Sequence, residues 1–132
     1  MEIVLDTSVI IAVIANEPEK AAIVRQTRGV TLVAPRSVHW EIGNAFSAML
    51  KRGRITLEQA QQAIKIYRAI PIRFVEIELE SALEIADELK IYAYDSYIIQ
   101  CAIQYKRPLM ALDKDLLGCA RQKGIRTIEV SL

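Results

Sequence analysis

Four acidic residues at separated points of the chain have the chemistry needed to hold a divalent cation: Asp6, Glu41, Asp95 and Asp113. Asp6 follows the apolar run 3–5, and Asp113 follows the apolar run 109–112. A carboxylate at the C-terminal end of a parallel strand points into the crevice where open α/β sheets bind ligands. Several carboxylates gathered there would repel one another, and a hard cation with oxygen ligands relieves that repulsion. The pattern predicts metal-assisted cleavage of phosphodiester bonds.

Three of these acids also have an ordinary structural interpretation. Asp6, Asp95 and Asp113 each stand at the start of a helical pattern, where aspartate is a good N-cap and a good partner for the helix dipole. Thr7 or Ser8 could cap the first helix equally well, so we favour a metal ligand over a cap for Asp6. Each cap is commonplace alone, and only the set of acids in one alternating pattern argues for a site.

Glu41 is ambiguous when it is taken alone. It falls at the border of the apolar face of a helix expected over residues 37–51, where a solvated glutamate is equally plausible. Asn44 lies one turn further along the same polar side, where its amide could orient a carboxylate or a ligand water. Asp115, two residues after Asp113, is expected on the solvated face or as a secondary contributor to the site.

The charge balance suits a polyanionic substrate if the four acids form one site. The chain carries 17 Lys and Arg against 16 Asp and Glu, a net charge of +1, and without the four acids 17 remain against 12, or +5. A basic surface around an acidic, metal-filled pocket attracts a polyanion, although ordinary surface charge explains the same numbers. The residues that could contact phosphates are Arg36, Lys51, Arg52, Arg54, Lys106 and Arg107. The alternative for most of them is a cation stabilising a helix C-terminus.

Strand and helix patterns alternate along the whole chain. β-rich runs predict strands over 2–5, 30–34, 72–77, 109–112 and 126–130. Apolar residues at helical spacing, with caps and stop signals, predict helices over about 7–15, 18–27, 37–51, from 57 onward, and over 79–89, 95–105 and 113–123. The capping box Thr56-Leu57-Glu58-Gln59 is the clearest of these signals. The alternation predicts a single α/β domain over residues 1–132, with one parallel sheet covered on both faces.

Composition is that of a globular protein with a substantial core. Of the 132 residues 52% are hydrophobic and 25% are charged. Cys101 and Cys119 are isolated and lack zinc-site spacing, so a reduced, cytosolic compartment is the default. The apolar stretch 3–15 is short and interrupted by Asp6, and it is neither a signal peptide nor a membrane span. We therefore expect a cytoplasmic protein that does not contact membranes.

The aromatic residues can be interpreted as packing residues or as functional ones. His39 is the only histidine, which disfavours a catalytic triad or a zinc site, and we interpret His39 and Trp40 as packing residues or part of a protein interface. Tyrosines surround Asp95 at positions 92, 94, 97 and 105. They could stack on unpaired bases, but core packing or a dimer contact is the favoured interpretation.

Four segments together resemble the motifs of the PIN-domain nucleases, and the length and layout resemble VapC toxins of prokaryotic toxin–antitoxin pairs. They are VLDTS at 4–8, Glu41-x-x-Asn44, YDS at 94–96 and LDKDL at 112–116. The resemblance implies a three-layer α/β/α fold with sheet order 3-2-1-4-5. It also implies that Asp6, Glu41, Asp95 and Asp113 bind Mg²⁺ or Mn²⁺ and cleave RNA, with Ser8, Asn44 and Asp115 in support. One departure is Ala111, which stands where the family commonly has Thr or Ser.

The same resemblance implies partners. The apolar stripes on the helices between residues 37 and 70 exceed what one face of a sheet needs. We therefore expect a homodimer and a groove for a segment of a cognate antitoxin protein, as in the family.

Three other functions compete with a nuclease. A haloacid dehalogenase-type phosphotransferase needs a second Asp two residues after the first, and Ser8 stands there. A response-regulator receiver needs an acidic pair that Leu5-Asp6 does not supply. A non-catalytic RNA- or protein-binding module of the same fold is the serious alternative, although such a module would be expected to have lost some of the four acids.

Overall fold

The computed structural model describes residues 1–131 and contains one parallel five-stranded sheet. The strands are β1 (Glu2–Leu5), β2 (Thr31–Pro35), β3 (Ile72–Val75), β4 (Leu109–Met110) and β5 (Thr127–Ile128). The helices are α1 (Thr7–Ile14), α2 (Lys20–Gln26), α3 (Ser37–Lys51), α4 (Leu57–Ala69), α5 (Leu79–Leu89), α6 (Ala93–Tyr105) and α7 (Lys114–Gln122). The strand order is β3-β2-β1-β4-β5 and every pairing is parallel. The α/β class and the sheet order expected from the sequence are confirmed.

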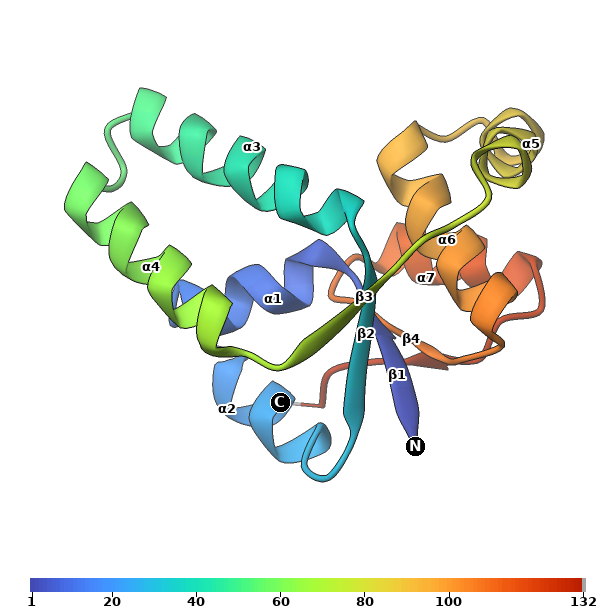
Figure 1. Cartoon of the computed structure of the whole chain (residues 1–132), viewed down its shortest axis with the longest axis horizontal. Helices are drawn as coiled ribbons and strands as arrows, with labels where there is room; N and C mark the ends of the chain where they lie inside the picture. Colours follow the sequence, from blue (N-terminus) through green and yellow to red (C-terminus); the bar gives the residue numbers. More distant parts are fainter. Residues whose placement is uncertain (132) are drawn as a thin grey trace.

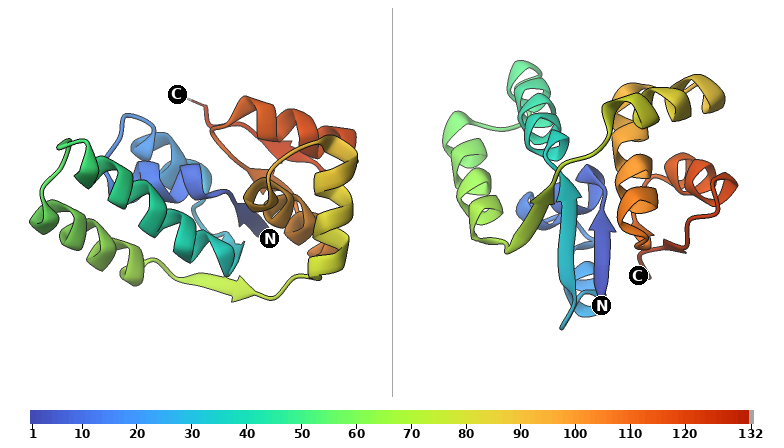
Figure 2. Two further views of the ribbon diagram at one scale, coloured as in Figure 1. Left: turned by 90° about the horizontal axis from the view of Figure 1, so that it is seen from above. Right: turned by 45° about the vertical axis from the view of Figure 1, so that its right-hand side comes forward.

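The helices form a layer on each side of the sheet. The chain moves outward from β1 through β2 to β3, and α1 to α4 lie on one side (Figure 1). It then crosses back to β4 and on to β5, and α5 to α7 lie on the other side (Figures 1 and 2). Right-handed crossovers require this change of side where the winding direction reverses. β1 and β4 are therefore neighbours at the reversal. The chain that follows β1 leads toward β2, and the chain that follows β4 leads in the opposite direction, toward β5.

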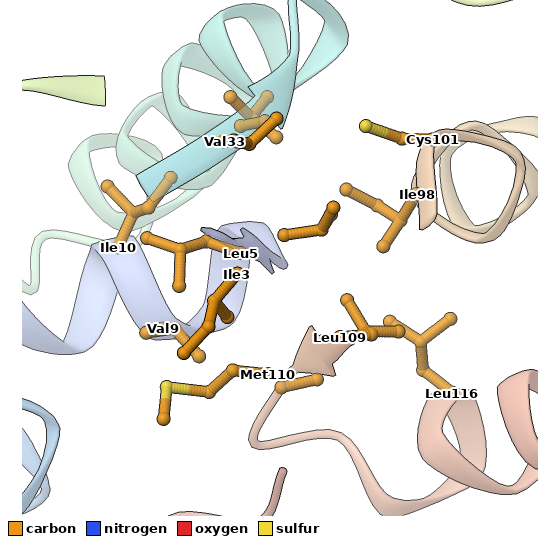
Figure 3. Packing of buried hydrophobic residues seen from close by; sticks show 14 of the residues in the cluster. Ile3, Leu5, Val9, Ile10, Val33, Ile98, Cys101, Leu109, Met110 and Leu116 are labelled. Carbon is orange, nitrogen blue, oxygen red and sulfur yellow. The ribbon is translucent and has the colours of Figure 1, made fainter. Parts of the chain in front are cut away.

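Short apolar strands form the centre of the core. Val4, Val33, Leu109 and Met110 are completely buried, because both faces of the sheet are covered. Figure 3 shows side chains of α1 on one side of these strands and those of α6 and α7 on the other. The core therefore fixes the strand ends from both sides, and the connections that follow those ends are held in place.

Three strands are shorter than the sequence predicts. β3 ends at Val75, β4 at Met110 and β5 at Ile128, rather than at residues 77, 112 and 130. In β4 the reason is local, because the Leu112 amide donates a 3.1 Å hydrogen bond to Oγ of Ser8 instead of to a strand neighbour. Apolar character continues past Met110, but sheet pairing does not.

Local signals set the start of α4 most clearly. In the capping box, the Gln59 amide donates to Oγ1 of Thr56 (3.1 Å) and the Thr56 amide donates to Oε1 of Gln59 (2.9 Å). Two helices begin elsewhere than expected: α2 begins at Lys20 rather than at residue 18, and α6 begins at Ala93, so Asp95 lies inside its first turn and does not cap it. None of the helices within residues 1–131 combines the length and the apolar character needed to cross a bilayer.

Candidate active site

The four acids arise from four elements at the C-terminal end of the sheet. Asp6 directly follows β1, and Asp113 follows β4 by three residues and precedes α7. Glu41 lies in the second turn of α3, and Asp95 lies in the first turn of α6. Since β1 and β4 flank the point where the winding reverses, this is the crevice in which open α/β sheets bind ligands.

Asp6 is a buried carboxylate that caps α1. Asp6 is only 7% exposed. Its Oδ2 accepts a 2.6 Å hydrogen bond from the Ser8 hydroxyl and a 3.3 Å bond from the Ser8 amide. Burial raises the pKa of Asp6, the Ser8 bonds oppose that rise, and the charge of Asp113 adds to it. The cap, which we had judged the weaker interpretation, is therefore present, and it does not preclude a ligand role.

Glu41 faces the start of α1. The Thr7 hydroxyl donates a hydrogen bond to Oε2 of Glu41 and so joins α1 to α3. Burial raises the pKa of Glu41 to about 7, with further increases from the charges of Asp6 and Asp95 and a decrease from the Thr7 bond. The ambiguity of Glu41 in the sequence is resolved: its carboxylate points inward and is not an ordinary solvated charge.

Asp95 belongs to the same electrostatic group. Burial raises its pKa, and the charges of Asp6 and Asp113 raise it further. The charges of Asp6, Asp95 and Asp113 thus each raise the pKa of at least one other acid of the group, although the four come from elements that span residues 6 to 113. Mutual repulsion of this kind is the condition under which a cation is bound favourably.

Asp113 and Ser8 join the two strand ends. Oδ1 of Asp113 accepts hydrogen bonds from the amides of Asp115 (2.9 Å) and Leu116 (3.2 Å), so Asp113 caps α7. Ser8 donates to Asp6 and accepts from the Leu112 amide. The support expected of Ser8 is therefore structural, whereas the side chain of Asp115 makes no hydrogen bond or ion pair within residues 1–131.

The other polar residues expected at the site differ in their distance from the four acids. Asn44 reaches across to α6, where its Nδ2 lies 3.5 Å from the hydroxyl oxygen of Tyr94. Lys51 lies ten residues beyond Glu41 on α3, about 15 Å along the helix axis. Arg52 and Arg54 follow it at the tip of the α3–α4 hairpin, remote from the sheet (Figure 1). Arg36 lies beside the sheet and forms an ion pair with Glu76.

The donor set suits a hard divalent cation, with water as part of the coordination. Within residues 1–131 no three His, Cys, Asp or Glu side chains lie close enough together to share one metal ion. Mg²⁺ commonly keeps several waters and takes only one or two carboxylates directly, so an open group of carboxylates meets its requirements. The absence of soft ligands among the four acids disfavours zinc or copper.

Thr7 is the contributor that the sequence interpretation missed. We had considered it only as a possible helix cap, whereas it is buried and holds Glu41. A signal was available, because a polar residue between buried Asp6 and an apolar helix needs a hydrogen-bond partner. The sequence could not show that this partner would be 34 residues away.

Comparisons with known proteins agree with this fold. A family model described as PIN domain matches residues 3–121. PAE2754 from Pyrobaculum aerophilum is similar in structure, with a TM-score of 0.74 and 22% identity over 98% of this chain and 91% of that one. VapBC2 from Rickettsia felis, solved bound to a DNA fragment from their promoter, gives 0.73 and 15% over 99% and 100% of the two chains. FitAcB from Neisseria gonorrhoeae gives 0.55 and 16% over 96% of each chain. A comparison with curated protein sequences gave no match.

Proposed function

Because the chain belongs to the PIN-domain family, we propose that it is a metal-dependent endoribonuclease and the toxin component of a VapBC-type toxin–antitoxin pair. The observation that carries the proposal is the electrostatic coupling of Asp6, Glu41, Asp95 and Asp113 at the end of the sheet. A structural protein gains nothing from four coupled carboxylates, because each raised pKa reflects an unfavourable interaction of the charged form.

In this proposal the acids divide between direct and indirect ligands. Asp6 and Asp95 hold the principal Mg²⁺ or Mn²⁺, and Glu41 and Asp113 complete the site directly or through water. Such an ion, when bound, lowers the pKa of a coordinated water and neutralises charge that develops on the phosphate. Ser8 and Thr7 fix the orientations of Asp6 and Glu41 by hydrogen bonds. We assign to Asn44 the orientation of a water and to Asp115 a secondary contribution.

The partners are part of the same proposal. We expect a cognate antitoxin protein and a homodimer, in the cytoplasm, with RNA as substrate. Two observations support protein partners: VapBC2 is among the similar structures, and Leu79 and Leu83 of α5 are 52% and 53% exposed. Exposed leucines one turn apart form an apolar stripe that association would bury. A monomeric sedimentation profile of the isolated chain would contradict the dimer.

A cleavage assay tests the enzyme directly. Purified protein is incubated with a mixed single-stranded RNA pool in Mg²⁺, in Mn²⁺ or in EDTA, beside the variants Asp6→Asn and Asp95→Asn. We expect cleavage only with the cation and only in the parent protein. If the parent binds RNA but leaves it intact under every condition, the chain is a non-catalytic RNA-binding module. Cleavage that persists in EDTA would exclude the metal mechanism.

A further inference from the structure

A hollow outside the acidic group lies between the start of α3, the end of α4 and β3. Its volume is about 360 Å³, and no acidic residue lines it. The residues that line it are mainly aromatic or cationic, namely Arg36, His39, Trp40, Tyr67, Arg68 and Phe74. This combination of rings and positive charge has no role in the site described above.

Trp40 is the most unusual residue of the hollow. It is 67% exposed, although neighbouring Tyr67 is 5% exposed and packs near Phe74 with ring centroids 6.3 Å apart. His39 is held by the Tyr67 hydroxyl, 3.2 Å from its Nδ1, and meets Trp40 edge to face at 4.9 Å. The cluster thus fixes its inner rings and leaves one indole at the surface. An exposed, positioned aromatic ring is suited to stacking.

Two arginines give the hollow its charge. Arg68 is exposed and forms no ion pair within residues 1–131. Arg36 is anchored through its Nε by Glu76 at 2.5 Å, so its guanidinium is oriented. The lining residues include no carboxylate, and because Glu76 compensates the charge of Arg36, Arg68 supplies the unpaired positive charge that would attract a phosphate.

A second hollow shares Arg36 with the first. It has a volume of about 180 Å³, and its polar lining residues are Arg36, Ser37, Tyr97 and Glu76, the last of which is paired with Arg36. Oγ of Ser37 is the one buried side-chain polar atom within residues 1–131 that has no hydrogen-bond partner. Tyr97 lies two residues after Asp95 and meets Tyr94 edge to face at 6.0 Å. The Ser37 hydroxyl lies beside the shared arginine, and its hydrogen-bonding capacity is unmet within the described residues.

We propose that these two hollows bind an unpaired stretch of the RNA substrate, with one base stacked on Trp40 and backbone phosphates on Arg36 and Arg68. The strand then passes Ser37 and Tyr97 toward the four acids. This inference rests on the proposed function, because it assigns the path of that substrate. The base must be unpaired, since a duplex buries the faces of its bases in its own stack. A nucleic acid fits better than a peptide, because the first hollow combines an exposed ring for base stacking with arginines for backbone phosphates.

Binding to an inactive protein tests the path separately from cleavage. Trp40 is the only tryptophan of the chain, so intrinsic fluorescence reports on this position alone. The Asp6→Asn protein in EDTA is titrated with short single-stranded RNA, with the same RNA as a duplex, and with an abasic strand of equal length. The affinities of further variants in the same background are measured by anisotropy of a labelled single strand.

We expect the single strand to quench Trp40 saturably and the duplex and abasic strands to do so weakly. Trp40→Ala should weaken binding about 5- to 150-fold, and Trp40→Phe should retain most of it. Arg68→Gln should weaken binding to all single strands and reduce its salt dependence. The matched controls are Leu57→Ala, another exposed apolar residue, and Arg126→Gln at the opposite end of the sheet, and both should leave affinity unchanged.

Three outcomes would overturn the inference. If the parent cleaves RNA but Trp40→Ala binds normally, the path is wrong and the proposed function stands. If Trp40 emission changes with protein concentration and not with RNA, a second copy of the chain covers the hollow instead. Absence of both binding and cleavage would reject the proposed function together with the path.

Discussion

A single carboxylate at the end of β1 has a structural role and a proposed chemical one, and substitution separates them. Asp6 caps α1 through Oδ2 while it contributes charge to the acidic group. Asparagine caps helices about as well as aspartate, whereas alanine does not cap.

We therefore predict that Asp6→Asn abolishes RNA cleavage and changes the free energy of unfolding by less than about 1 kcal/mol. Asp6→Ala should abolish cleavage and also destabilise the fold, by about 1–2 kcal/mol. Urea denaturation and a cleavage assay on both variants measure the two effects. Full activity of Asp6→Asn would refute its place in the site.

The raised pKa of Glu41 makes stability depend on pH. In the folded chain Glu41 stays protonated up to a pH of about 7, whereas its ordinary pKa of 4.5 applies when the chain is unfolded. Between these values the folded state binds one more proton than the unfolded state. The free energy of unfolding contributed by Glu41 therefore falls as the pH rises from about 4.5 to about 7, and is constant outside that window.

We predict that Glu41→Gln removes this part of the pH dependence in metal-free protein. The variant should gain stability relative to the parent as the pH is raised from 5 to 7.5, because the amide cannot ionise. Denaturation series in EDTA measure the difference, with Glu84→Gln on the exposed face of α5 as the control. Asp6 and Asp95 are unchanged in both proteins, so parallel curves for parent and variant would show that Glu41 titrates normally.

Among the secondary-structure elements, α4 has the clearest local sequence signal, which is its capping box. Its two reciprocal hydrogen bonds satisfy backbone groups at the start of the helix. Thr56→Ala should lower the free energy of unfolding by about 1 kcal/mol, measured by urea denaturation. Thr56→Ser keeps a hydroxyl and should stay within a few tenths of a kcal/mol of the parent. Equal losses in the two variants would mean that the methyl group of Thr56, rather than the cap, is responsible.

Local signals predicted the elements better than their ends. The box at Thr56 and the apolar spacing of α5 placed those helices correctly. The start of α6 was misplaced because Tyr92 occupies the N-cap with no side-chain hydrogen bond, and Asp95 had seemed the better cap. The end of β4 depends on Ser8, more than a hundred residues away in sequence. Strand ends and site contacts of this kind are tertiary, so no local pattern could contain them.

The acidic group also has a consequence for the molecule as a whole. Asp6 follows β1, Glu41 and Asp95 lie on α3 and α6, and Asp113 precedes α7, so a cation among them binds the folded chain and not the unfolded one. That the chain forms one domain over residues 1–132 stays a prediction, and cooperative unfolding would support it.

We predict that Mg²⁺ at ten times its Kd stabilises the parent by about 1.4 kcal/mol, which raises Tm by about 4–6 °C. Asp95→Asn should lose most of this shift. Asp87→Asn removes an exposed carboxylate of α5 instead and should keep it. Differential scanning calorimetry with and without EDTA measures the shifts, and equal shifts in all three proteins would indicate non-specific ion binding.

The pairing of β1 with β4 has a consequence for biosynthesis. Val4 pairs with Leu109, so the first strand acquires this neighbour only after Leu109 has been made. Contacts that join such distant residues form late, because the intervening loop must close first. A nascent chain that stops before residue 109 lacks both β4 and Asp113, so its acidic group is incomplete. Under the proposed function, translation therefore delays RNA cleavage until residues 109–113 have been made and β4 has paired with β1.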